Sequence, residues 1–241
     1  MISIVGLGKA GKCLTKNFIK AGIEVENVWD RDEKKAKQFA EENNVEFRKI
    51  ENIKSEVVFI AVSDNAIEEI SNKLQTKEFH AHLSGYLPST ILSSKRKLSF
   101  HPNSPLNENT SLKDIIIDIE GETEYGKEIC SKLNSIPMII DPEDKKLLHL
   151  SAVINSNFFL SLMYISNKIF PKNWEKISRS LVFNTYNNIT EKGFGKALTG
   201  PVARKDEKVI SEEREIFSKY FPVEIYDNLI EVLKEVRDKK I

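Results

Sequence analysis

The sequence contains little cysteine and no excess of charge of either sign. The two cysteines, Cys13 and Cys130, lie far apart, and there is no Cys-x-x-Cys or Cys-x-x-His spacing. This argues against a disulfide framework or a structural zinc site, so no metal is expected. Lys plus Arg and Asp plus Glu both number 36, which gives a formal net charge of zero. Because nucleic-acid binders usually carry a basic excess, we expect no nucleic-acid partner.

The chain also lacks a long run of purely apolar residues. The most apolar stretch, residues 147–165, approaches the length of a membrane span but is interrupted by six polar side chains: His149, Ser151, Asn155, Ser156, Asn157 and Ser161. Polar groups are costly in hydrocarbon, so we expect a buried core helix and no membrane partner. A strand predicted at Ile2–Val5 leaves no room for a signal peptide. Together with the scattered cysteines, this predicts a cytoplasmic location.

Strand and helix patterns alternate in the first part of the sequence. Apolar runs predict strands at residues 2–5, 25–29, 47–50, 56–62, 79–83, 115–120 and 137–140. Periodic segments predict helices between them, at residues 10–21, 33–42, 65–74 and 122–133. This alternation is typical of βαβ units and a parallel sheet.

After Asp141-Pro142 the pattern is almost entirely helical. The expected helices cover residues 143–170, 174–190, 207–220 and 224–239. We therefore predict an α/β protein. A Rossmann doubly wound parallel sheet (residues 1–141) is followed by a smaller all-helical domain (residues 142–241) for substrate binding or dimerisation.

A glycine-rich motif follows the first predicted strand. The segment Gly6–Gly11 matches G-x-G-x-x-G and opens the first predicted helix, which is the context that the motif requires. Its glycines serve a tight turn, a close approach to a pyrophosphate and helix–strand packing. A glycine-rich turn without a ligand is the alternative. The motif predicts dinucleotide contacts at Gly6, Leu7, Gly8, Lys9, Ala10 and Gly11.

The residues after the second predicted strand leave the choice of dinucleotide open. Asp30 stands where an acid would bind the ribose 2′-hydroxyl of NAD. Arg31 follows it and is suited to the 2′-phosphate of NADP. Asp30 could equally be a turn or helix-cap residue. We expect NADP as the cofactor, with NAD possible.

The fourth and fifth predicted strands end in polar and glycine residues. Ligands of open α/β sheets bind at the carboxyl ends of strands, so these residues are expected to line the nicotinamide half of the site. Helix capping is a compatible role for some of them. The predicted set is Val62, Ser63, Asp64, Ser84 and Gly85.

Several motifs together resemble a known family. They are GLGKAGKCL at Gly6–Leu14, VWDRD at Val28–Asp32, HLSG at His82–Gly85, HP at His101-Pro102, HLSAVINSN at His149–Asn157 and LTGPVARKD at Leu198–Asp206. The chain resembles a two-domain family within the 6-phosphogluconate-dehydrogenase-like superfamily. Its members have a Rossmann-like domain and a helical C-terminal domain of unknown function. The resemblance implies NADP binding and an oxidoreductase architecture, but no substrate.

Two positions depart from the family pattern. The family commonly has a Ser-Arg-type pair where this chain has Asp30-Arg31, which bears on the preference for NADP. The family's last motif usually reads Arg-Gly-Asp, whereas Lys205 replaces the glycine here. The lysine argues against a tight turn at that position.

Candidate chemistry beyond the cofactor centres on histidine. His149 and Asn157 are expected on one face of the apolar helix and are our catalytic candidates. Their partners could instead lie in another helix or in a dimer interface. His101, Thr199 and Arg204 are substrate candidates, Arg204 as a clamp for an anion. Pairing with Asp206 is the structural alternative for Arg204.

These residues predict an oxidoreductase that transfers a hydride to or from a small carbonyl or imine substrate. The G-x-x-x-K…Asn pattern of the β-hydroxyacid dehydrogenases is missing. One alternative is therefore a non-catalytic NADP-binding sensor or regulatory protein. Another is a structural dimerisation module. Under every hypothesis we expect a homodimer formed through the helical domain.

Overall fold

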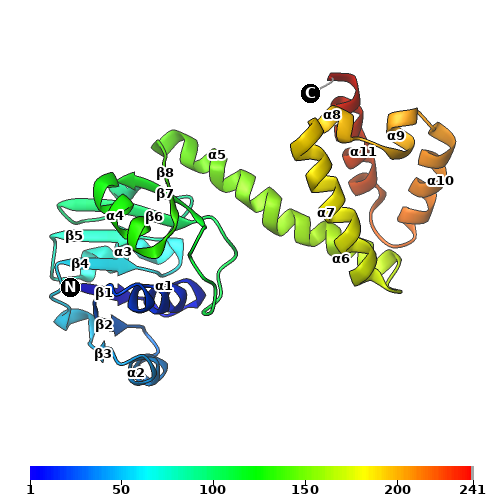
Figure 1. Cartoon of the computed structure of the whole chain (residues 1–241). Helices are drawn as coiled ribbons and strands as arrows, with labels where there is room; N and C mark the ends of the chain where they lie inside the picture. The colour runs from blue at the N-terminus through cyan, green and yellow to red at the C-terminus, as the bar shows by residue number, and fades with distance from the viewer. Residues whose placement is uncertain (240–241) are drawn as a thin grey trace. The chain divides into compact units, whose positions relative to one another are not determined.

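The computed structural model describes residues 1–239 and divides into two compact units, Met1–Ile154 and a second that begins at Asn155. The first unit contains an eight-stranded sheet in the order β3-β2-β1-β4-β5-β6-β7-β8 (Figure 1). The strands are β1 (Ile2–Val5), β2 (Val25–Trp29), β3 (Glu46–Phe47), β4 (Val57–Ile60), β5 (Phe79–His82), β6 (Arg96–Pro102), β7 (Ile116–Gly121) and β8 (Ile136–Ile139). The predicted doubly wound α/β fold is confirmed, although β6 and β7 pair antiparallel.

Helices cover both faces of this sheet. They are α1 (Lys9–Lys20), α2 (Glu33–Glu42), α3 (Asp64–Lys73) and α4 (Thr123–Leu133). One apolar cluster joins α1, α2 and α4 to the sheet, and a second joins α3 to the other face. Because the central strands are covered twice, they are continuous apolar runs such as Val57–Ile60. Phe59 is fully buried, and its ring packs edge-on against Phe18 and Phe100.

Strand β6 was not predicted. It begins with the charged residues Arg96 and Lys97 and continues to Pro102. Leu98 and Phe100 are fully buried in the core on one face, while Ser99 and His101 alternate with them. The strand carries an apolar–polar alternation that charged residues obscure at its start.

All elements described after β8, up to residue 239, are helical, as predicted. Helix α5 (Pro142–Val153) begins with proline at its first turn and continues through a π-helical turn, Ile154–Phe158, into α6 (Phe159–Ile169). It is followed by α7 (Trp174–Lys192), α8 (Phe194–Ala197), α9 (Gly200–Arg204), α10 (Glu207–Ser218) and α11 (Val223–Lys239). The all-helical part thus begins at Pro142, while the compact units divide at 154/155 because the start of α5 belongs to the sheet unit.

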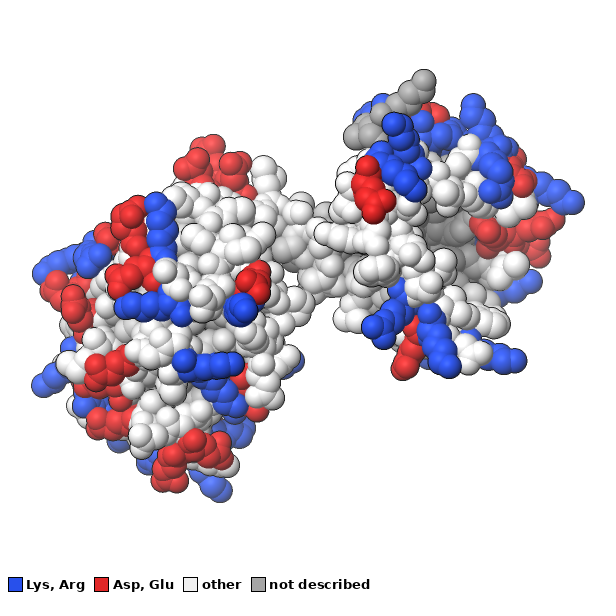
Figure 2. Space-filling model, viewed as in Figure 1, with Lys and Arg blue, Asp and Glu red and all other residues white. Residues whose placement is uncertain are grey.

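The prediction that residues 147–165 form a buried core helix was wrong. The most apolar window of the continuous helix Pro142–Ile169 has none of its residues buried, and Figure 2 shows a surface without charged side chains in this region. By length and composition this helix could cross a membrane, which for a single helix is weak evidence. Apolar composition indicates a helix face that is buried against some other surface, but it does not identify that surface.

Candidate functional site

The glycine loop between β1 and α1 is shaped by close backbone approaches. Gly6 has φ +96°, and a Cβ there would lie 2.6 Å from the carbonyl oxygen of Ala61. A Cβ on Gly11 would lie 1.8 Å from the carbonyl oxygen of Gly6. By contrast, a Cβ on Gly8 would meet nothing within 4 Å. Gly8 is the N-cap residue of α1, so this open space lies beside the helix N-terminus, where a pyrophosphate would bind.

Asp30 is hydrogen-bonded to this loop. Its Oδ2 accepts a hydrogen bond of 2.7 Å from the backbone N–H of Leu7, and its Oδ1 accepts one from Asp32 N–H at 3.0 Å. Helix α2 is capped by Asp32, not Asp30. Arg31 and Lys34 are exposed and form no hydrogen bond or ion pair within residues 1–239, whereas Lys35 pairs with Asp32 at 3.1 Å. The end of β2 therefore presents basic side chains.

The ends of β4 and β5 lie at the same carboxyl edge of the sheet. Ser84 Oγ donates to Asp64 Oδ2 at 2.9 Å and accepts from the N–H groups of Tyr86 and Leu87. The hydroxyl thereby ties the loop after β5 to the start of α3. Val62 is half-buried, and Ser63 caps α3 without a side-chain hydrogen bond.

Two histidines meet at Gly85. A Cβ on Gly85 would lie 2.8 Å from His101 Nε2 and 2.8 Å from His149 Nδ1. The two imidazole rings are 6.3 Å apart between centroids, and the Tyr86 ring packs 5.9 Å from that of His149. The buried Nδ1 of His149 has no hydrogen-bond partner among the described residues. The structure thus brings together three predicted residues, Gly85, His101 and His149, within one compact unit.

A buried polar network lies behind His101. His101 Nδ1 donates to Asp118 Oδ1 at 2.8 Å, and Asn103 Nδ2 donates to the same oxygen at 2.5 Å. Lys145 Nζ donates to Asp118 Oδ2 at 3.3 Å and to Ser99 Oγ at 2.5 Å. Asp118 and Lys145 are both fully buried. Neither residue was among the predicted site residues.

Charge stabilises Asp118 in its ionised form. Burial by itself would raise the pKa of this carboxyl group. The hydrogen bond from His101 and the charges of His101 and Lys145 outweigh burial and hold the pKa below its ordinary 3.8. A buried carboxylate within an apolar strand is a recognisable signal, because such groups need partners.

The other two histidines have structural roles. Burial lowers the pKa of His82 to about 4, and that of His80 to about 4 as well. Ser84 N–H donates to His82 Nδ1 (3.1 Å), so Nε2 carries the proton that is donated to the Pro88 carbonyl (3.2 Å). His80 bonds Ser71 Oγ at 2.8 Å and the Thr76 carbonyl at 2.9 Å. Both rings are fully buried and hydrogen-bond the segments that precede and follow β5.

The remaining candidates lie in the helical unit. Asn157 is exposed within the π-helical turn, so the α-helical spacing that placed it on one face with His149 does not continue to it. Thr199 is the N-cap residue of α9, and Arg204 is exposed with no ion pair inside residues 1–239. Asp206 Oδ1 accepts from Val209 N–H and caps α10, so it is not paired with Arg204.

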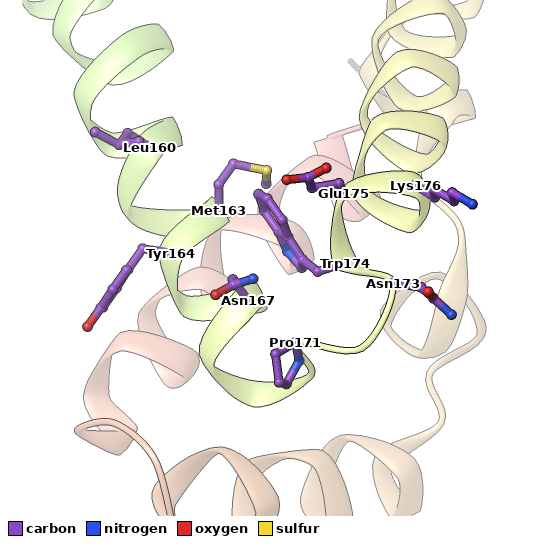
Figure 3. Close-up of a pocket in the computed structure, with 9 residues that line it drawn as sticks. All are labelled: Leu160, Met163, Tyr164, Asn167, Pro171, Asn173, Trp174, Glu175 and Lys176. Atoms are coloured by element: carbon purple, nitrogen blue, oxygen red, sulfur yellow. The ribbon is translucent and has the colours of Figure 1, made fainter.

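The helical unit contains a cavity of about 560 Å³ between α6 and the start of α7. Figure 3 shows Met163 and Trp174 against one another in it, with Asn167 and Pro171 below them. The Trp174 indole N–H is oriented away to Ser166 Oγ at 3.2 Å. None of the predicted site residues lines this cavity.

The comparisons with known proteins agree with this architecture. Residues 1–83 match the family described as NADP oxidoreductase coenzyme F420-dependent, and residues 116–231 match the domain of unknown function DUF2520. A solved protein from Thermotoga maritima is 30% identical with a TM-score of 0.76, over 100% of this chain and 99% of that one. The chain belongs to the family that joins these two domains. The predicted family and the NADP cofactor class are thereby confirmed.

More distant solved structures share the fold. A candidate NADP oxidoreductase from Bacteroides fragilis is 22% identical with a TM-score of 0.82, over 97% of each chain. A reductive aminase from Aspergillus terreus, in complex with NADPH and ethyl-5-oxohexanoate, is 13% identical. Its TM-score is 0.72, over 99% of this chain and 93% of that one. The comparison with curated proteins gives no match.

Proposed function

We propose that this protein of the NADP oxidoreductase family is a reductase of small carbonyl or imine compounds that uses NADPH. One observation carries the proposal. The open cradle at Gly8 and the histidine pair at Gly85 follow strands β1 and β5 of the same parallel set, so both lie at its carboxyl edge. Bound NADPH would supply the hydride. The histidines are the groups of this chain that can hold or move a proton near neutral pH.

The preference for NADP over NAD follows from the end of β2. Both carboxylate oxygens of Asp30 already accept backbone hydrogen bonds, one of them from the glycine loop. The exposed guanidinium of Arg31 and ammonium of Lys34 are the groups that would pair with a 2′-phosphate. Asp30 therefore shapes the loop, and Arg31 selects the nucleotide.

For the substrate we assign a role to two of the candidates. His149 and His101 contact the reacting group, beside a Gly85 that leaves room for both rings. Asn157, Thr199 and Arg204 belong to the helical unit, and their catalytic and substrate roles stay predictions. A fold shared with a reductive aminase supports a carbonyl or imine as the group reduced.

The first experiment titrates the purified protein with NADPH and NADH and follows nicotinamide fluorescence. We expect tighter binding of NADPH, and loss of that preference in Arg31→Ala. Oxidation of NADPH is then measured with a panel of ketones, keto acids, ketone–amine mixtures and cyclic imines. Binding without any turnover would favour an NADP-binding sensor over a reductase. Binding of neither nucleotide at micromolar concentration would contradict the proposal.

A homodimer through the helical domain is part of the proposal. In the described residues from Asn155 onward, the buried hydrophobic side chains are Val202, Ile210 and Phe217. Many large apolar side chains are exposed, among them Phe158, Leu160, Leu181, Phe183 and Tyr186. A helical unit of this size needs a larger apolar core, and a second copy of the same surface would provide it. We place this dimer in the cytoplasm.

Sedimentation analysis tests the dimer. The wild-type chain should sediment as a dimer at micromolar concentration, and Leu181→Glu, which puts a charge on the apolar face, should dissociate it. Glu191→Gln, an exposed change on the same helix α7, is the matched control and should leave the dimer intact. A wild-type monomer at that concentration would contradict the assignment.

A further inference from the structure

We propose that His101 is the proton donor of the reduction, that the buried Asp118 positions it, and that Lys145 balances the charge of Asp118. The inference rests on the proposed function, since it names the acid that completes that reaction. It begins with the sheet register. His101 of β6 lies directly opposite Asp118 of β7 in the antiparallel pair. Their side chains therefore share a face and meet at 2.8 Å.

The Asp118 contact fixes which nitrogen of His101 can act. Because Nδ1–H donates to Asp118, the ring is held in one orientation and Nε2 is the nitrogen left for a substrate. Nε2 and the neighbouring Cε1 lie beside Gly85, and the His101 side chain is 20% exposed. Asp118 itself is fully buried and held by Asn103 as well, so it is a positioning residue with no access to substrate.

The positive charge of Lys145 offsets the negative charge that Asp118 would otherwise direct at the imidazole alone. An unbalanced buried carboxylate would bind the imidazolium as an ion pair and retain its proton. Lys145 Nζ contacts the other oxygen of Asp118, so the pair is neutral and the proton of His101 can be released. The titratable groups that face His101 are Asp118 from β7, His82 from β5, and Lys145 and His149 from α5.

The reaction balances with these groups. The carbon of a C=O or C=N bond would gain a hydride, which bound NADPH would supply on becoming NADP⁺. His101 gives the proton on Nε2 to the oxygen or nitrogen, and the π electron pair of the double bond becomes the new O–H or N–H bond. The neutral imidazole then regains a proton from solvent through its exposed edge. The product is an alcohol or an amine.

The test compares pH profiles of kcat/KM in the full-length protein. A required acid loses its proton as pH rises, so activity falls on the basic limb. Lys145→Met removes a positive charge and should move that limb to higher pH by about one unit. Asp118→Asn should move it to lower pH by about one unit, and the double variant should return it near the wild-type position. The double variant also covers the case in which Lys145→Met alone fails to fold.

Two further variants complete the test. His101→Asn should lower kcat by about 10²–10⁴-fold, with NADPH affinity unchanged. Glu120→Gln is the matched control, because Glu120 is a buried carboxylate on the same strand that bonds Ser89 instead of a histidine. It should leave the basic limb in place.

Each failure has a distinct meaning. If the wild type reduces a substrate but His101→Asn keeps most of its kcat, the donor role is overturned while the reductase proposal stands. If Lys145→Met and Asp118→Asn shift the limb in the same direction, or no further than Glu120→Gln, the charge-balancing role is overturned. If the wild type binds NADPH and reduces nothing in the panel, the proposed function and the donor role are both overturned.

Discussion

The sheet unit and the helical unit hold their apolar side chains in opposite ways. In the sheet unit, the rings of Phe18, Phe59, Phe79 and Phe100 are fully buried. In the helical unit, Phe183 is 64% exposed and Leu181 is 63% exposed. A sheet covered on both faces completes its own core, whereas stacked helices leave apolar faces for another surface. The difference shows that the sheet unit completes its own core, and it supports the proposed association of the helical unit.

The largest expected loss of stability follows a substitution in the core of the sheet unit. Phe59→Ala removes a ring that packs on Phe18 and Phe100, and it should reduce the free energy of unfolding by about 3–5 kcal/mol. Phe183→Ala makes the same chemical change at an exposed site and should cost well under about 1 kcal/mol in a monomer. Urea unfolding of both variants at low protein concentration measures the contrast. Equal losses would contradict it.

Acidic pH should destabilise the sheet unit more than the helical unit, because all four histidines lie in the sheet unit. The pKa of His80 and of His82 is about 4 in the folded protein and about 6.5 in the unfolded chain. The unfolded chain therefore binds protons first as pH falls from 6.5 towards 4, and stability is lost in that window. We expect a loss of about 2 kcal/mol per histidine between pH 7 and pH 5.

The measurement is urea unfolding of the wild type and of His80→Gln at both pH values. The variant should be less stable at pH 7, because it loses the ring's hydrogen bonds, but should have a shallower pH dependence. If its stability falls as steeply as that of the wild type, burial of His80 is not the cause.

The glycine loop offers a sharper comparison within the sheet unit. Gly8→Ala should leave stability nearly unchanged, because its Cβ meets nothing within 4 Å. It should weaken NADPH binding roughly tenfold, or about 1.4 kcal/mol, because the methyl group occupies the space left for the phosphates. Gly11→Ala should instead destabilise the fold, since its Cβ would lie 1.8 Å from the Gly6 oxygen. Thermal unfolding together with NADPH titration distinguishes the two variants, and equal stability losses would contradict this account.

The smallest expected effect lies in the helical unit. Lys205 ends α9 with φ +56°, a left-handed conformation in which a side chain is disfavoured. Lys205→Gly should therefore stabilise the unit by up to about 1 kcal/mol. Lys219→Gly, in a right-handed position after α10, is the control and should not stabilise. A lower melting temperature for Lys205→Gly would show that the lysine side chain makes a compensating contact.

Much of the fold could be predicted from sequence because its signals are local. Periodicity and the glycine motif located most strands and helices, and Asp141-Pro142 located the start of the helical part. Strand β6 was missed because Arg96 and Lys97 hide the alternation of Leu98, Ser99, Phe100 and His101. The register of β6 against β7 could not be predicted at all, since it depends on residues distant in sequence.

The candidate site was predictable only in part. The glycine loop and Gly85 are visible in the sequence, and histidine is a natural candidate wherever it occurs. Asp118 offered a signal that was passed over, as a charge inside the apolar run Ile115–Glu120. Lys145 gave no such signal. It lies among charged residues at the start of a helix, and nothing in that sequence shows that this one lysine is fully buried.

The hydrogen bond from Leu7 to Asp30 constrains any attempt to redesign the coenzyme preference. In the dinucleotide-binding fold the acid after the second strand contacts the ribose 2′-hydroxyl. Here the same carboxylate also braces the glycine turn that we propose as the pyrophosphate site, so a substitution at Asp30 should weaken the binding of either coenzyme. A protein engineer would have to work through Arg31 and Lys34 and leave the aspartate alone.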